Sequence, residues 1–585
     1  MGIGYTIDTP AKVAHYGISS VISLVDDILI ERMRKFYSEK LNLPFTPISE
    51  KEEDHRARRI TEYLNLMDKM VSEKFASLKK SLDTKGEELH KYIDMLPDFS
   101  EIKQKFHDFM EHNTVKEDVA HWIDEHLHPG SIDVNIMTKL DKENYRDNVK
   151  LANEFNDAHA ALRGYANSTL CSSIVFSAGM NPRLYGYIEK FDDFYPDEND
   201  YIKKKIILKV SDYRSAIIQG KFLAKKGLWV SEYRIESGLN CGGHAFATDG
   251  YLMGPILEEF KTNRAMLIQT THEMCVGALK NKNRHVPLLP LPIKITAQGG
   301  VGTAEEHEFL LNHYELDSVG WGSPFLLVPE VTNVDNHTLG LLAAAKEEDL
   351  YLSNISPLGV PFNSLRGNTK DIEKQGFIEK GRPGSACPKK FVSFNTEYTE
   401  QAICLSSRQY QNLKIQELDG LNLSTEDKKK SFDAITEKVC LCVGLTNAAL
   451  IVNNIPTNGD GSGVSICPGP NIAYFDKVVS LKEMIDHIYG RIKLVNESSR
   501  PNMFVKELRL YVDYLKTKIS EAPKPFTEKQ LNYFDSFQKN LDEGIEYYKT
   551  LFADFETKLE MLKENIYDDL EEIRRELQEL APATA

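Results

Sequence analysis

The stretch that decides the fold is residues 293–306, IKITAQGGVGTAEE. The apolar run Ile293–Ala297 predicts a buried strand, and the acidic residues after Thr303 predict a helix that begins at Ala304. Glycines between a strand and a helix let the backbone approach a phosphate, and the helix N-terminus supplies unpaired N–H groups. The stretch therefore predicts a phosphate-binding turn, with a plain tight turn as the alternative. Its members are Gln298, Gly299, Gly300 and Gly302.

A second turn of small residues follows one predicted helix later, in residues 318–325, SVGWGSPF. Two successive turns of this kind at the carboxyl ends of late strands form the usual phosphate site of a β/α barrel. Gly322 and Ser323 are therefore predicted to share the phosphate with the first turn.

Short apolar runs alternate with helix-length segments over much of the chain, which predicts βαβ units on a parallel sheet. Seven runs qualify as strands: 17–25, 134–137, 173–177, 205–210, 229–233, 293–297 and 317–320. An eighth would have to come from Met1–Tyr5. The predicted fold is an α/β protein, an eight-stranded (β/α)8 TIM barrel formed by residues 1–50 and 131–370.

Three further regions surround the predicted barrel. Residues 51–130 are charged and helical, with the run Lys51–Arg59 expected on a solvated helix face. Residues 371–477 are predicted to be irregular and contain five cysteines. Residues 478–585 are predicted to be helical. Apolar residues at steps of three and four between Ile545 and Leu580 predict a long helix docked on another helix, within the chain or between subunits of a homo-oligomer.

A histidine follows two glycines at the end of the predicted strand that begins at Trp229, in the sequence CGGH of residues 241–244. An imidazole with an ordinary pKa near 6.5 could take a proton from a carbon acid at neutral pH. His244 is therefore the candidate catalytic residue. The alternative is a histidine that only hydrogen-bonds its loop.

These motifs together resemble the nitronate monooxygenase family and its related flavin enoyl reductases. Gly242-Gly243-His244 resembles that family's histidine loop, and residues 298–303 and 320–325 resemble its two phosphate turns. Residues 134–137 are similar to a family strand that ends in Asn135, although Asp133 replaces a glycine. Residues 1–4 and 361–366 resemble its first-strand and post-barrel segments. The resemblance covers about residues 1–25 and 131–370.

The resemblance implies an FMN cofactor across the barrel mouth, with its phosphate bound by Gly300, Gly302, Gly322 and Ser323. It places His244 as acid or base beside the flavin, and Met1, Gly2, Asn135 and Lys209 in contact with the cofactor. For Lys209, an ion pair with Asp212 is the alternative. Cys241 replaces the family's small residue, as a filler, a nucleophile or a redox partner. The polar residues 245–250 indicate a substrate pocket unlike that of a simple nitronate oxidase.

Five cysteines lie in predicted loops outside the resemblance, and two of them precede prolines. Thiolates at such turns could hold a [4Fe–4S] cluster or zinc, but only a CxC spacing is present, so packed thiols remain the alternative. The candidates are Cys387, Cys404, Cys440, Cys442 and Cys467.

The net charge of -16 argues against a nucleic-acid partner. No apolar stretch reaches the ~18 residues that span a bilayer, and no secretory signal is recognisable, so a cytoplasmic protein with reduced thiols is expected. The leading hypothesis is a nitronate monooxygenase-like oxidoreductase acting on a small molecule. The alternatives are an enoyl reductase of lipid or polyketide synthesis, whose helical regions could dock a carrier protein, an iron–sulfur flavoprotein reductase, and a non-enzymatic scaffold.

Overall fold

The computed structural model describes residues 3–81, 87–111, 116–177, 179–236, 242–245, 249–386, 389–457, 461–495, 500–553 and 560–580. At its centre is a sheet of seven strands, every neighbouring pair of which is parallel. Their order is β1 (Ser20–Ser23), β2 (Ile132–Ile136), β5 (Ser172–Phe176), β6 (Lys204–Val210), β7 (Val230–Glu236), β8 (Lys294–Gln298) and β9 (Ser318–Gly320). All seven predicted strands are confirmed.

The closed eight-stranded barrel is not confirmed. Residues 3–8 form turns and no strand, while Met1 and Gly2 lie outside the described residues. The backbone of this segment bonds to distant parts of the chain, because Gly4 N–H donates to Leu445 O and Tyr5 O accepts from Asn333 N–H. In the described ranges neither β1 nor β9 pairs with an eighth strand. The protein therefore has a curled half-barrel sheet, with many helices around it.

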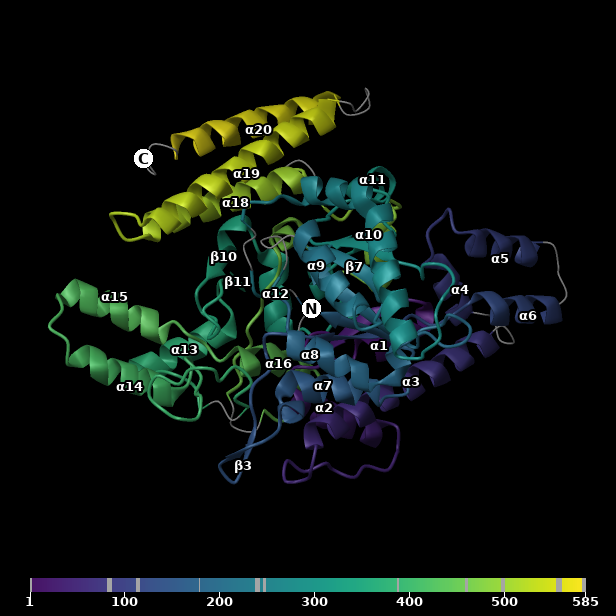
Figure 1. The fold of residues 1–585 in the computed structure, drawn as a ribbon, viewed down its shortest axis with the longest axis horizontal. Coiled ribbons are helices and arrows are strands. Elements are labelled where there is room, and N and C mark those ends of the chain that lie inside the picture. The colour runs from purple at the N-terminus through teal and green to yellow at the C-terminus, as the bar shows by residue number, and fades with distance from the viewer. Residues whose placement is uncertain are drawn as a thin grey trace.

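Helices connect successive parallel strands and pack on the outside of the sheet (Figure 1). They are α7 (Asp157–Ala166), α8 (Pro182–Tyr187), α9 (Tyr213–Ala224), α10 (Met253–Asn281) and α11 (Ala304–His313). Because helices cover the sheet, strand residues such as Ile206 and Leu208 are almost fully buried. This burial explains why the strands appear in the sequence as nearly continuous apolar runs.

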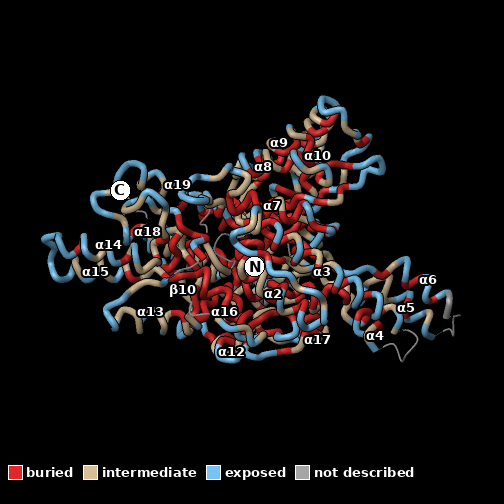
Figure 2. Tube along the Cα trace, turned by 90° about the horizontal axis from the view of Figure 1, so that it is seen from below, coloured by how far each residue is buried: buried red, intermediate tan, exposed pale blue. Residues whose placement is uncertain are grey.

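The helical region 51–130 consists of two structural parts. The long helix α3 (His55–Lys80) packs into the main core beside α1 (Thr9–Val13) and α2 (Asp27–Lys40). Helices α4 (Glu87–Asp94), α5 (Glu101–Glu111) and α6 (Lys116–His126) share a separate small core around Phe106 and Trp122. Figure 2 shows α4–α6 at one end of the molecule, away from the buried centre. Of the described residues in region 51–130, α4–α6 are therefore the part that projects (Figure 2).

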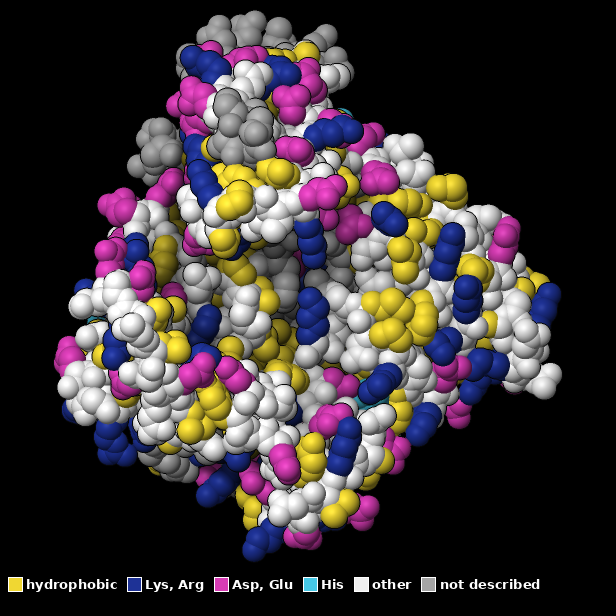
Figure 3. All heavy atoms as spheres, turned by 60° about the vertical axis from the view of Figure 1, so that its left-hand side comes forward, with side chains coloured by type: hydrophobic (Ala, Val, Ile, Leu, Met, Phe, Trp, Pro, Cys, Tyr) yellow, Lys and Arg dark blue, Asp and Glu magenta, His cyan; other side chains and the backbone are white. Residues whose placement is uncertain are grey.

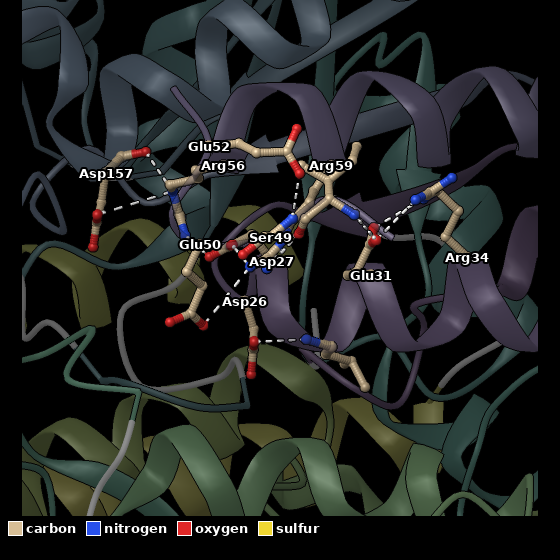
Figure 4. Close-up of polar contacts among 12 residues, drawn as sticks. Asp26, Asp27, Glu31, Arg34, Ser49, Glu50, Glu52, Arg56, Arg59 and Asp157 are labelled. Carbon is tan, nitrogen blue, oxygen red and sulfur yellow. Dashed lines mark hydrogen bonds and ion pairs between the residues drawn. The ribbon is translucent and has the colours of Figure 1, made fainter. Parts of the chain in front are cut away.

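A buried ionic network joins α2 and α3 (Figure 4). Asp27 pairs with Arg56 at 2.5 Å and with Arg59 at 2.8 Å, and Arg56 also donates to Leu24 O and Val25 O. The expectation that Lys51–Arg59 is a solvated face is therefore wrong for Arg56 and Arg59, which are buried. The sequence alone did not show that the carboxylate of Asp27 in α2 would pair with both arginines.

The region expected to be irregular contains four helices separated by long irregular segments. It contains α13 (Thr369–Glu379), α14 (Arg408–Asp419), α15 (Thr425–Thr436) and α16 (Leu441–Val452), and it follows α12 (Asn336–Ala344) and the hairpin of β10 (Leu350–Ser353) with β11 (Phe362–Leu365). Ser407 and Ser424 cap α14 and α15 by accepting from the N–H groups of Tyr410 and Asp427. These caps were a usable sequence signal.

The C-terminal region is a bundle of α18 (Met503–Glu521), α19 (Glu528–Ala553) and α20 (Glu560–Glu579), preceded by α17 (Leu481–Ile488). The apolar pattern from Ile545 to Leu580 therefore belongs to two helices, and the single long helix is wrong. They run antiparallel, because Gln538 donates to Leu577 O while Lys549 pairs with Glu571. A small hairpin, β3 (Tyr145–Arg146) with β4 (Val149–Lys150), completes the described strands.

Within the described ranges no single helix is long and apolar enough to cross a membrane. The bent pair α15 and α16 meets that test by length and composition only.

Candidate functional site

A cavity of about 720 Å³ lies at the carboxyl ends of the sheet strands. Parallel strands bring their carboxyl ends to one edge, so residues distant in sequence meet there. Ten of the residues predicted for catalysis or cofactor binding line this cavity: Asn135, Lys209, Gly242, Gly243, His244, Gln298, Gly299, Gly300, Gly322 and Ser323. Met1 and Gly2, also predicted, lie outside the described residues.

The first glycine turn follows β8, and side chains from later in the chain hydrogen-bond to its backbone. Gly299 and Gly300 have φ of +97° and +83°, a backbone region that favours glycine. Gly300 O accepts from Asn471 at 2.6 Å and from Arg500 at 2.8 Å. These contacts fix the turn while its other side faces the cavity.

Gly302 differs from the other residues of this turn. It is buried, and its N–H donates to Glu306 Oε2 at 2.9 Å. Glu306 in turn pairs with Arg500 at 2.7 Å. The predicted bond from Gly302 to a phosphate would therefore require Glu306 to move, whereas the Gly300 turn requires no such change.

The second glycine turn follows β9. A Cβ added to Gly322 would meet no atom within 4 Å, so the space beside this glycine is open. Ser323 Oγ accepts from Gly469 N–H at 2.6 Å, which ties the turn to the segment that precedes α17. Both predicted turns thus border the same cavity, as the barrel pattern predicted.

His244 lies between β7 and α10, and the hairpin of β10 and β11 holds its loop. Asn363 N–H donates to Gly243 O and Ala245 N–H donates to Pro361 O, each at 2.9 Å. The Nε2 atom of His244 is 2.7 Å from Ser356 Oγ. Burial lowers the pKa of His244 to about 4. The imidazole is therefore neutral at physiological pH.

Charged strand residues form the floor of the cavity. Lys209 pairs with Glu236, which also accepts from Gln298 at 2.8 Å. Burial by itself raises the pKa of Glu236, but the contacts with Lys209 and Gln298 together outweigh burial, so the net pKa is lowered. Lys209 thus pairs with Glu236, while Asp212, the alternative partner, caps α9 by accepting from Ser215 N–H. Asn135 and Asp133 of β2 also line the floor.

The cysteines predicted as metal ligands do not all meet. Cys404, Cys440 and Cys442 belong to one buried cluster with Val25, Leu140 and Phe391, and Cys387 lies outside the described residues. Cys467 lines the cavity beside Gly243, and burial raises the pKa of its thiol to about 11. Among the described side chains no group of three is arranged to hold a metal ion. The iron–sulfur cluster stays a prediction.

Several residues at the site were missed by the sequence reasoning. Asn471 and Arg500 support the first turn, and His487 Nε2 is 2.9 Å from Gly302 O. Ser356 contacts His244. All four come from segments outside the βαβ pattern, and the sequence contains no motif that links them to the turns.

Comparisons with known proteins give little further information. No family model matches the chain, and no curated protein matches it. A solved structure with some likeness is the enoyl reductase domain of MlnA from the macrolactin biosynthesis cluster of Bacillus amyloliquefaciens. It has 11% sequence identity and a TM-score of 0.31, over 74% of this chain and 86% of that chain. A TM-score this low does not establish a common fold.

The surface shows no dominance of one charge sign on the face drawn in Figure 3, where Lys and Arg side chains alternate with Asp and Glu. Hydrophobic side chains lie between them. This face therefore favours no particular class of charged partner.

Proposed function

We propose that this protein is an FMN-dependent oxidoreductase that reduces a carbon–carbon double bond conjugated to a carbonyl group. The observation that carries the proposal is the single cavity bordered by both glycine turns, the polar strand ends and His244. The volume of about 720 Å³ lies within the range of cofactor and ligand pockets, roughly 300–1,000 Å³.

The residues present fit a phosphorylated flavin. Glycines with positive φ and open space beside Gly322 leave backbone N–H groups accessible to phosphate oxygens. Gly300, Gly322 and Ser323 would hold the phosphate, and Asn135, Lys209 and Gln298 would contact the ring or the ribityl chain. The bound flavin would supply hydride chemistry between a nicotinamide donor and the alkene.

His244 then acts on the substrate carbonyl. Hydride addition to the β-carbon places negative charge on the carbonyl oxygen, and a neutral imidazole can donate a hydrogen bond to that oxygen. Ser356 at Nε2 fixes the orientation of the ring. The α-carbon takes a proton from water, so one hydride and one proton complete the reduction.

The low pKa of His244 favours alkene reduction over nitroalkane oxidation. Proton removal from a neutral nitroalkane needs a base whose pKa lies near the working pH. His244, with a pKa of about 4, is a weak base at pH 7. Oxidation of a preformed nitronate anion needs no such base and is the competing activity.

The test begins with FMN titration of the purified chain, followed by two assays. We expect tight FMN binding and oxidation of NAD(P)H that depends on an enoyl thioester, without oxygen. Oxygen consumption with a nitronate, and no enoyl reduction, would instead support the nitronate monooxygenase reaction. A chain that binds no FMN would contradict the flavin proposal.

A further inference from the structure

We propose that His307 is a specificity residue of the same cavity, whose Nε2–H donates a hydrogen bond to the phosphate of the cofactor. The inference rests on the proposed FMN function and deepens it, because it names the group that distinguishes FMN from unphosphorylated flavin.

His307 stands between the two glycine turns. It lies in the second turn of α11, the helix that follows the first glycine turn, and it lines the cavity. Its Nδ1 contacts Trp321 Nε1 at 2.9 Å, and Trp321 belongs to the second glycine turn. One side chain thus connects the two loops predicted to share a phosphate.

The contact with Trp321 determines the tautomer of His307. An indole N–H can only donate, so Nδ1 of His307 must be the acceptor and must carry no proton. Burial lowers the pKa of His307, which keeps the ring neutral at physiological pH. The single ring proton is therefore on Nε2, and this nitrogen can only donate.

The Nε2 donor of His307 has no hydrogen-bond partner in the described part of the chain, although the ring lines the cavity. A neighbouring histidine shows the contrast. His487 uses both ring nitrogens within the protein, Nε2 at Gly302 O and Nδ1 at Leu494 N–H. His487 is a support of the turn, whereas His307 retains a donor for a ligand.

The chemistry of the surroundings points to a phosphate as the acceptor. The two turns offer backbone N–H groups, all of which are donors, and His307 adds a donor of fixed direction between them. A ligand group that satisfies several converging donors must carry several acceptor oxygens. A riboflavin hydroxyl would meet only part of this set.

Asparagine and glutamine separate the two functions of the ring. The Asn amide lies near the position of Nδ1, so His307→Asn can keep the contact with Trp321 but loses the Nε2 donor. The Gln amide reaches the position of Nε2, so His307→Gln can keep the donor but loses the contact with Trp321. Dissociation constants of both variants and of the wild type are measured with FMN and with riboflavin, and thermal unfolding is the folding control.

We expect His307→Asn to bind FMN about 10- to 100-fold more weakly, the loss typical of a hydrogen bond to a charged group. Riboflavin binding should not change, and His307→Gln should retain more FMN affinity than His307→Asn. Equal losses for both flavins, unchanged FMN binding, or a larger loss in His307→Gln would overturn the inference. If the wild type binds neither flavin, the proposed function itself fails, and the inference fails with it.

Discussion

Two regions of this molecule bury polar groups, and they differ in how those groups are satisfied. Around Asp27, the carboxylate and the guanidinium groups of Arg56 and Arg59 bond to one another and to nearby carbonyls. At the carboxyl ends of the strands, glycine turns and the His307 donor face a cavity of about 720 Å³. Closed networks support a fold, while groups that face a cavity can bind a ligand. The following predictions, from the largest effect to the smallest, test this contrast.

The largest effect is expected at His244. His244→Ala should lower kcat/KM for enoyl reduction by about 10²- to 10⁴-fold, the usual contribution of a positioned proton-transfer or hydrogen-bonding group. FMN affinity should change little, because the glycine turns hold the phosphate. Steady-state kinetics and FMN titration measure the two quantities. Loss of FMN together with activity would mean that His244 supports the loop.

A substitution in the Asp27 network should lower the stability of the fold but not the affinity for FMN. Asp27→Asn leaves Arg56 and Arg59 buried without their carboxylate, which should cost about 3–5 kcal/mol in the free energy of unfolding. Urea denaturation measures the change. Glu52→Gln removes the solvent-exposed partner of Arg58 and is the matched control, for which we expect no measurable change. Equal changes in the free energy of unfolding for the two variants would mean that the buried network stabilises the fold no more than a surface ion pair does.

A substitution at Gly322 tests whether the glycine turns that face the cavity bind the cofactor. A methyl group there meets no protein atom, so Gly322→Ala should fold normally but narrow the space for the cofactor. FMN affinity should fall at least about tenfold, which corresponds to ~1.4 kcal/mol. Gly376→Ala on α13 also adds a methyl in open space and should leave FMN affinity unchanged. Normal FMN binding by Gly322→Ala would place the phosphate elsewhere.

The smallest effect is a pH dependence of stability. Burial lowers the pKa of His244 to about 4 in the folded protein, below the value of about 6.5 in an unfolded chain. The unfolded chain then binds more protons between these values, so His244 contributes stability above pH ~6.5 that is lost as the pH falls toward 4. Urea midpoints of the wild type should fall between pH 7 and pH 5, and less steeply in His244→Asn. Parallel curves would contradict the low pKa.

The sequence predicted the repeating part of the structure well. All seven strands occur where apolar runs alternate with helix-length segments, because a sheet covered by helices buries both of its faces. Both glycine turns follow their strands as expected. The prediction of a long helix from Ile545 to Leu580 was wrong, since the same spacing of apolar residues suits two helices that pack on each other.

The amino-acid sequence by itself determined the strands and the glycine turns that follow two of them, because each depends on neighbouring residues. Only the tertiary structure decided that residues 3–8 form turns and that Arg56 and Arg59 are buried. It also decided that Asn471 and Arg500 contact the first turn and that His307 contacts Trp321 of the second. Such contacts join segments tens to hundreds of residues apart. Their energy depends on which groups the folded chain excludes from water, and no local pattern in the sequence records that choice.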